Sequence, residues 1–194
     1  QLADGTTTDR SLPQQVAAVS SISAVAAGLG HSLALKSDGS GIWAWGANSR
    51  GQLGMGSTNT QTGVVAVTGL TGTVSAIAAG RNNSMALRST GALLGWGDNT
   101  YGQIGDGSTT RRSSPAAVSS LSGVAMAVVG SYHAIAVTTS GVVSTWGRND
   151  EGRLANATTT DRTTAGGVSA NGWGFVQSIE WVNQINTTSS GNTL

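Results

Sequence analysis

Two histidines, His31 and His133, occupy equivalent places in the sequence and are the residues best suited to metal or acid–base chemistry. The chain contains 2 His and 0 Cys, which excludes disulfides, thiolate zinc sites and a cysteine nucleophile. A third equivalent position carries Asn83, a hydrogen-bonding side chain but a poor metal ligand. We therefore interpret the histidines as structural, each bonding the backbone of a neighbouring loop, and we predict no metal and no cofactor.

Carboxylates are scarce, with 9 Asp and Glu in 194 residues. Asp4, Asp38 and Asp106 each precede a glycine, a pattern typical of turns in which the Asp side chain bonds the local backbone. The sequence has no D-x-D-x-D-G calcium loop, G-x-S-x-G elbow, H-E-x-x-H helix or P-loop. We predict that the protein is not an enzyme, and a paired-carboxylate hydrolase is the alternative left open.

Arginine recurs at equivalent positions in Arg10, Arg112 and Arg162, with Gln61 in the repeat between them. We interpret this row as solvated side chains that protect the edge of a sheet, and contact with an anionic partner is the alternative. Only 10% of residues are charged and the net charge is +1, which argues against a nucleic-acid partner. No apolar stretch approaches the ~18 residues of a membrane span. By composition alone, we expect a bacterial protein that is extracellular or on the cell surface.

These residues are positioned by a repeated phrase, WGANSRGQLGMG, which returns as WGDNTYGQIGDG and, in eroded form, as WGRNDEGRLANA. The copies are spaced by about 50 residues, which indicates a repeat architecture. We expect each Trp to fill the gap between neighbouring repeats, and the Gly and Asn that follow to form a tight turn. These structural positions are Trp45, Gly46, Asn48, Gly51, Trp96, Gly97, Asn99, Gly102, Trp146, Gly147, Asn149 and Gly152.

Each repeat is expected to contain four short strands, because alternating apolar residues and turn signals recur without a helical period. Leu33 and Leu35 alternate with smaller or polar residues, as in a half-buried strand, and residues 62–67 form the fourth strand of the first full repeat. The expected units are 1–21, the back half of a repeat; the repeats 22–73, 74–123 and 124–170; and 171–194, which is either a degenerate front half-repeat or a cap.

The line G-x-x-H-S-x-A-L followed by W-G-x-N-x-x-G-Q-L-G resembles the regulator of chromosome condensation repeat, over roughly residues 1–168. Asn83 in place of His, and the loss of Gly and Gln in 153–157, depart from that pattern. The resemblance implies an all-β fold, a β-propeller that usually has seven blades. Three full repeats plus partial ones at the ends make about half of such a ring. We therefore expect a homo-oligomer, in which a second copy completes the ring, or a fragment of a longer chain.

The loop between the first two strands of each repeat varies most, and it carries Leu29, Arg81, Asn82 and Tyr132. Variable loops on a rigid scaffold often bind partners, and Tyr and Arg are common anchors, although neutral drift explains variation equally well. We predict a non-enzymatic scaffold that binds a protein or another macromolecule through this loop face. One alternative is a structural subunit of an extracellular assembly or filament. The resemblance implies another, guanine-nucleotide exchange, which is the activity of the founding family member.

Overall fold

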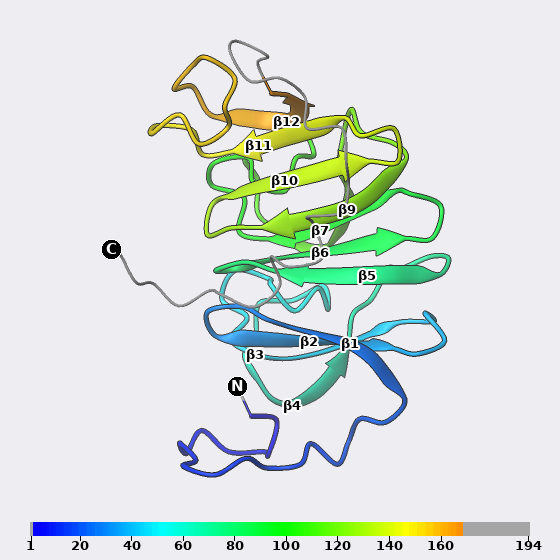
Figure 1. Cartoon of the computed structure of the whole chain (residues 1–194). Helices are drawn as coiled ribbons and strands as arrows, with labels where there is room; N and C mark the ends of the chain where they lie inside the picture. The colour runs from blue at the N-terminus through cyan, green and yellow to red at the C-terminus, as the bar shows by residue number, and fades with distance from the viewer. Residues whose placement is uncertain (1, 169–194) are drawn as a thin grey trace.

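The computed structural model describes residues 2–168, and these form three four-stranded antiparallel sheets, here called blades 1, 2 and 3, that stack one above the other (Figure 1). This confirms the predicted all-β fold with four strands per repeat. Within the described residues, no helix is long and apolar enough to cross a membrane. The strands are β1 (Ile22–Ala27), β2 (His31–Lys36), β3 (Ile42–Gly46), β4 (Gln61–Ala66), β5 (Val74–Ala79), β6 (Asn83–Arg88), β7 (Leu93–Gly97), β8 (Arg112–Ala117), β9 (Val124–Val129), β10 (His133–Thr138), β11 (Val143–Gly147) and β12 (Arg162–Gly167).

Within each blade the strands lie in chain order, so that neighbouring strands are joined by hairpins or loops. The blades meet through their first two strands, since β5 contacts β1 and β2, and β9 contacts β5 and β6. The fourth strand of each blade is therefore its outer edge. Pro115, which cannot donate a backbone hydrogen bond, lies in the edge strand β8, as expected for a proline in a sheet.

Strand β2 is buried on both of its faces, which corrects the expectation of a half-buried strand. In β2, Leu33, Ala34 and Leu35 are all buried, although alternate side chains of a strand point to opposite faces. Leu33 and Leu35 belong to the core against blade 2, whereas Ala34 lies on the opposite face, beside its pairing partner Trp43 of β3. The period-2 pattern of burial is therefore lost.

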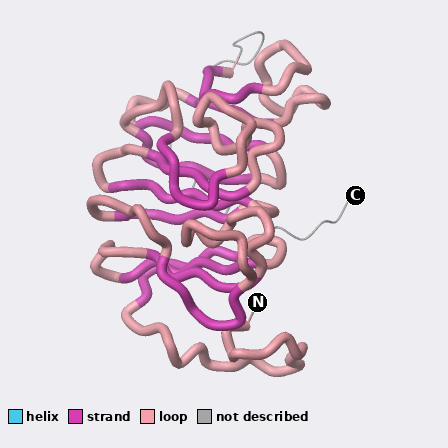
Figure 2. The backbone as a smooth tube through the Cα atoms, turned by 180° about the vertical axis from the view of Figure 1, so that it is seen from behind, coloured by secondary structure: helices cyan, strands magenta, loops and turns pink. Residues whose placement is uncertain are grey.

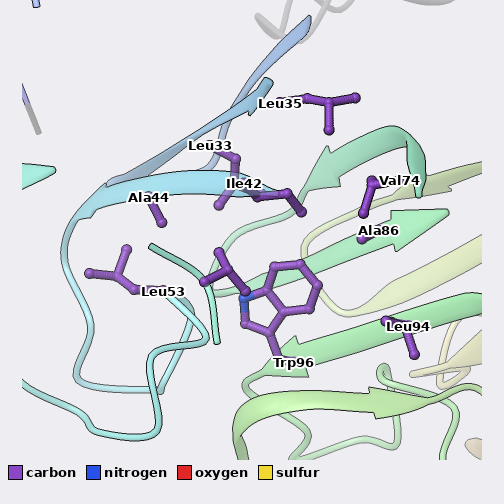
Figure 3. Close-up of a cluster of buried hydrophobic side chains, with 10 residues drawn as sticks. Leu33, Leu35, Ile42, Ala44, Leu53, Val74, Ala86, Leu94 and Trp96 are labelled. Carbon is purple, nitrogen blue, oxygen red and sulfur yellow. The ribbon is translucent and has the colours of Figure 1, made fainter. Parts of the chain in front are cut away.

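The core between blades 1 and 2 is built around Trp96, which is fully buried. Its ring rises from β7 toward Leu53 and Ile42 of blade 1 (Figure 3). A second core, between blades 2 and 3, contains Trp146, together with Met85 and Leu87 of β6. The conserved geometry of the repeat phrase thus places one indole in each seam between blades, where it contributes a large buried apolar surface.

Residues 2–21 contain no strand in the structure, although they were expected to be the back half of a repeat, the part that carries the fourth strand in blade 2. A fourth strand pairs with a third strand, as β8 does with β7, and residues 2–21 include no such partner. The segment still contacts blade 1 in repeat register, because Gly5 N donates to Thr62 O. The fourth strand of blade 1 also begins and ends one residue earlier than predicted. Residues 171–194, expected to be a half-repeat or cap, lie outside the described residues.

Candidate functional site

The longest loops of all three blades gather on one face of the molecule, opposite the short hairpins (Figure 2). Antiparallel pairing causes this, because the start of β2 lies beside the end of β3, where His31 pairs with Gly46. We call this side the loop face, and the opposite side, with residues 37–41, 89–92 and 139–142, the hairpin face. The loop face comprises residues 28–30, 47–60, 80–82, 98–111, 130–132 and 148–161.

Each long loop is held by one buried asparagine. In blade 2, Asn99 Oδ1 accepts from Ile104 N at 2.9 Å, and Asn99 Nδ2 donates to Ser108 O and Thr110 O, both at 3.0 Å. Asn48 and Asn149 make the same set of bonds in blades 1 and 3. A buried side chain that satisfies several backbone groups fixes the loop, because breaking any one of these bonds leaves a buried polar group unpaired.

The seam between blades is closed by the indole of the following repeat. Trp96 Nε1 donates to Gln52 O at 2.9 Å, and Trp146 Nε1 donates to Gln103 O at 3.0 Å. Glycine is required beside each ring, since a Cβ on Gly54 would lie 2.8 Å from Trp96 Nε1. The loops are therefore anchored to the next blade, and side chains on the loop face project from a rigid base.

His31 lies in the seam between blades 1 and 2, where its Nε2 is 2.9 Å from Ser84 Oγ, and Ser84 Oγ donates to Gln52 O at 2.8 Å. The prediction that His31 bonds a loop backbone directly is therefore wrong, because the serine side chain lies between them. Burial lowers the pKa of His31 to about 4, so the imidazole is neutral. Burial, and then the charge of Arg153, also lower the pKa of His133. No group of three or more His, Asp or Glu side chains that could hold a metal occurs within residues 2–168.

The structure brings together two of the four predicted binding residues. Arg81 Nη1 donates to Tyr132 OH at 2.7 Å, across the seam between blades 2 and 3. Leu29 is 70% exposed and lies beside this pair, since its backbone N donates to Arg81 O. Asn82 instead supports the seam, where its Oδ1 accepts from Gln52 Nε2 at 3.4 Å.

Two further residues complete a cluster that the sequence analysis missed. The rings of Tyr101 and Tyr132 meet edge to face, with centroids 5.3 Å apart. The guanidinium of Arg148 lies 5.0 Å from the Tyr101 centroid and 5.6 Å from that of Tyr132, and Arg81 lies 5.5 Å from Tyr132. We call these four residues the Tyr–Arg cluster. Tyr101 and Arg148 occupy the positions of the repeat phrase that differ between copies, and this variation was the signal that could have revealed them.

Charged pairs surround the cluster. Arg148 bonds Asp150, and this bond raises the pKa of Arg148 above its ordinary value, so the guanidinium stays charged. Arg153 donates to Asp150 at 2.7 Å and also pairs with Glu151. Arg81 has no carboxylate within ion-pair distance among the described residues, and its charge remains unneutralised.

The row of equivalent arginines is less free than predicted. Arg10 pairs with Asp4 at 2.7 Å, and Arg112 pairs with Asp106 at 2.6 Å. Hydrogen bonds from Thr6 and Arg10 lower the pKa of Asp4 to about 2. These aspartates therefore do more than form turns. Arg10 and Arg112 are thus neutralised within their own repeats, whereas Arg162 donates to Gly167 O at 3.2 Å and makes no ion pair among the described residues.

Models of the Regulator of chromosome condensation (RCC1) repeat match most of the described chain. One form of the repeat matches residues 22–52, 74–103 and 124–153, and a second form matches residues 40–87 and 90–137. Each of the three blades thus contributes to a match.

Two curated proteins show the sequence similarity. The Ultraviolet-B receptor UVR8 of Arabidopsis thaliana is 33% identical over 132 residues, which are 66% of this chain and 30% of that protein. Protein RCC2 of Homo sapiens is 40% identical over 90 residues, which are 45% of this chain and 17% of that protein. The chain therefore spans less than a third of the length of these relatives.

Two solved structures show the same fold. Prp20p from Saccharomyces cerevisiae, characterised with its binding properties to Gsp1p and histones, superposes with a TM-score of 0.69 at 20% identity. That match covers 78% of this chain and 39% of Prp20p. Yeast RCC1 (Prp20) bound to Kap60 gives a TM-score of 0.68, also at 20% identity, and covers 78% of this chain and 37% of that protein.

Proposed function

Because this chain belongs to the Regulator of chromosome condensation (RCC1) repeat family, we propose that it is a non-enzymatic β-propeller module that binds another protein through its loop face. The family alone does not assign a partner, since one fold hosts many functions. Prp20p, a protein of the same fold, binds Gsp1p and histones, and this supports protein as the class of partner.

The Tyr–Arg cluster is the observation that carries this proposal. Tyr and Arg are the residue types that most often dominate the energy of protein interfaces. Their side chains here are held in place by one another, as Tyr132 contacts Arg81, Tyr101 and Arg148. A rigid anchor loses little conformational entropy when a partner binds, which favours affinity.

One hollow in the described part of the chain is lined mainly by apolar and neutral polar side chains. This hollow of about 370 Å³ lies between the first residues of the chain and blade 1. Arg10 is its only charged lining residue and already pairs with Asp4. The other lining residues are Leu2, Ser11, Leu12, Pro13, Gln14, Val16 and Trp45.

The proposal is tested by blocking one face at a time. Because the chain has no Cys, a single cysteine at exposed Ser131 on the loop face, or at exposed Ser122 beside the hairpin face, can carry a bulky polyethylene glycol. Partners are then captured from cells that make the protein and identified by mass spectrometry. We expect the Ser131→Cys conjugate to lose partners that the Ser122→Cys conjugate keeps. Equal capture by both conjugates would refute loop-face binding.

A second candidate, assembly with a second copy of the chain, is favoured by one observation. Val25 of β1 is 74% exposed, whereas Ile77, its counterpart in β5, packs against the core between blades 1 and 2. The two residues are equivalent because they pair with Ala34 and Ala86 respectively. Val25 is thus an exposed apolar residue at a position that packs against a neighbouring blade in blade 2. A blade from another copy of the chain could cover it, as in a completed ring or a structural assembly.

A further inference from the structure

Of the two seams within residues 2–168, only the one between blades 2 and 3 carries a Tyr–Arg cluster, although the repeat offers an equivalent place at the seam between blades 1 and 2. At the seam between blades 1 and 2, different residue types occupy the four equivalent positions, and they make neither an aromatic pair nor a cation–π contact in the structure. The repeat therefore does not need this cluster in order to join two blades. The residues equivalent to Arg81, Tyr101, Tyr132 and Arg148 are Leu29, Arg50, Asn82 and Asp98.

The unpaired positive charge of Arg81 indicates the chemical class of ligand that the cluster can bind. Arg81 is exposed and uses one nitrogen to bond Tyr132 OH, so its remaining N–H groups face solvent. A planar guanidinium fixed in this way can bind a carboxylate through two parallel hydrogen bonds. Arg50 and Arg111, both exposed on the same face, add positive charge. The surface is thus suited to an anion presented by a partner.

The surroundings favour a protein carboxylate over a nucleic-acid backbone. Asp150 and Glu151 lie on the same face and would repel a continuous run of phosphates. Exposed Leu29 and the edge of the two tyrosine rings offer apolar contact next to Arg81. A single acidic side chain flanked by an apolar one matches this arrangement.

We propose that the Tyr–Arg cluster recognises a short segment of the protein partner that carries a single Asp or Glu next to an apolar side chain, with the carboxylate on Arg81 and the apolar side chain on Tyr101 and Tyr132. This inference rests on the proposed function, because it identifies the chemistry of the partner that the loop face binds. Tyr132 acts as the positioning residue, since it contacts Arg81, Tyr101 and Arg148.

The test uses a displayed library of random short peptides as the probe. Peptides selected on the wild-type chain are divided by whether polyethylene glycol on Ser131→Cys or on Ser122→Cys blocks them. We call the peptides that are blocked by polyethylene glycol at Ser131→Cys the loop-face group, and we expect their sequences to be enriched in Asp and Glu. Its members should bind Arg81→Ala about tenfold more weakly or worse, and Arg81→Lys at an intermediate level. Tyr132→Phe, which removes the hydroxyl that orients Arg81, should also weaken binding.

Lys36→Ala is the matched control. Lys36 also contacts an aromatic ring, since its Nζ lies 4.7 Å from the Trp43 centroid, but it lies at the hairpin end of β2. Its removal changes the net charge by the same amount and should leave the affinity within about twofold, because distant surface charges are screened. Urea unfolding of each variant separates loss of binding from loss of fold.

The outcomes distinguish this inference from the proposed function. Loop-face peptides that are not acidic, or that bind Arg81→Ala as well as wild type, would overturn the inference and leave loop-face binding intact. Stronger binding of a short DNA duplex than of acidic peptides, lost in Arg81→Ala, would overturn it in favour of phosphate. A loss of stability in Arg81→Ala with no loss of affinity would show that the cluster only joins the blades. If no selected peptide is blocked at Ser131, the proposed function itself fails.

Discussion

At the scale of single residues, the seam between blades 1 and 2 depends on a neutral imidazole. His31 bonds Ser84, and Ser84 bonds the carbonyl of Gln52, which also accepts from Trp96. Two side chains of blade 2, Ser84 and Trp96, therefore donate to one loop carbonyl of blade 1, and His31 is linked to it through Ser84. Protonation of His31 would place an unpaired positive charge in this buried seam, and burial is the reason why its pKa is depressed.

The first prediction concerns stability against pH. The folded pKa of His31 is about 4 and its ordinary value is 6.5, so the unfolded chain takes up a proton first as the pH falls. The contribution of His31 to stability is complete above pH 6.5 and is lost progressively as the pH falls toward about 4. Since one pH unit of difference corresponds to about 1.4 kcal/mol, the loss approaches about 3 kcal/mol. Urea unfolding followed by Trp fluorescence measures it.

His31→Asn is the control for this prediction, because Asn83 shows that the repeat accommodates Asn at this position. The variant should be less stable than wild type at neutral pH, but its stability should fall less steeply over the same interval. His133, whose pKa is lowered in the same direction, accounts for part of the remaining slope. The ion pair of Asp4 is lost only at lower pH, since its pKa is about 2. An unchanged slope in His31→Asn would contradict the assignment.

The residue scale is also where sequence analysis was weakest. Arg81 and Tyr132 were selected as separate variable residues, and nothing in the sequence showed that they bond each other. Tyr101 and Arg148 were missed because they lie inside a phrase interpreted only as turn chemistry. Contacts between residues about 30 to 50 positions apart in the sequence depend on how two blades stack. The repeat period sets this separation in sequence, but it does not show which side chains meet.

At the scale of elements, the loop face depends on the glycine that ends each third strand. Gly46, Gly97 and Gly147 all have φ near +101°. In that conformation the chain leaves the strand and enters the long loop, and a side chain there would be strained. A Cβ on Gly97 would also lie 2.4 Å from Asn82 O, in the loop that carries Arg81.

The second prediction follows from this glycine. Gly97→Ala should lower the free energy of unfolding by about 3 kcal/mol, because it combines a positive φ with a backbone clash. The readout is thermal or urea unfolding. Gly63→Ala is the matched control, since Gly63 lies in β4 and a Cβ there meets nothing within 4 Å. That variant should be as stable as wild type or more stable by up to about 1 kcal/mol. Equal destabilisation of both would count against the role given to Gly97.

The positions of the strands were largely predictable from the sequence, but their burial and their pairing partners were not. The period of two and the Gly-rich turns located four strands per repeat, with an error of one residue in β4. The half-buried interpretation of β2 failed because Ala34, which faces away from blade 2, is also buried, beside Trp43 of β3. Residues 2–21, the expected back half of a repeat, form no strand because they contain no third strand with which a fourth could pair. In both cases the outcome depends on neighbours in space and not on local sequence.

At the scale of the whole molecule, three blades form a stack whose first blade leaves a seam position bare. Val25 is exposed there, while its counterpart Ile77 contributes to a core. Blade 2 shows that a blade of this repeat packs against a neighbour on each of its two faces. Val128 of β9 is also partly exposed, at 42%.

The third prediction tests assembly through this surface. Val25→Asp should leave the stability of the chain within about 0.5 kcal/mol, because the side chain is exposed. It should, however, reduce the particle mass measured by light scattering after gel filtration, if copies associate at blade 1. Ile77→Asp, at the equivalent position that packs against the core between blades 1 and 2, should instead destabilise the chain. A wild-type mass equal to that of one chain would remove the second-copy candidate.

The measurement that tests the central claim most directly is amide hydrogen exchange, compared between the free chain and the chain bound to its captured partner. If the loop face is the binding surface, exchange should slow at residues 80–82, 130–132 and 148–153, and remain unchanged at residues 37–41, 89–92 and 139–142. Protection confined to the hairpin face, or to β1 with no change around the Tyr–Arg cluster, would contradict the account.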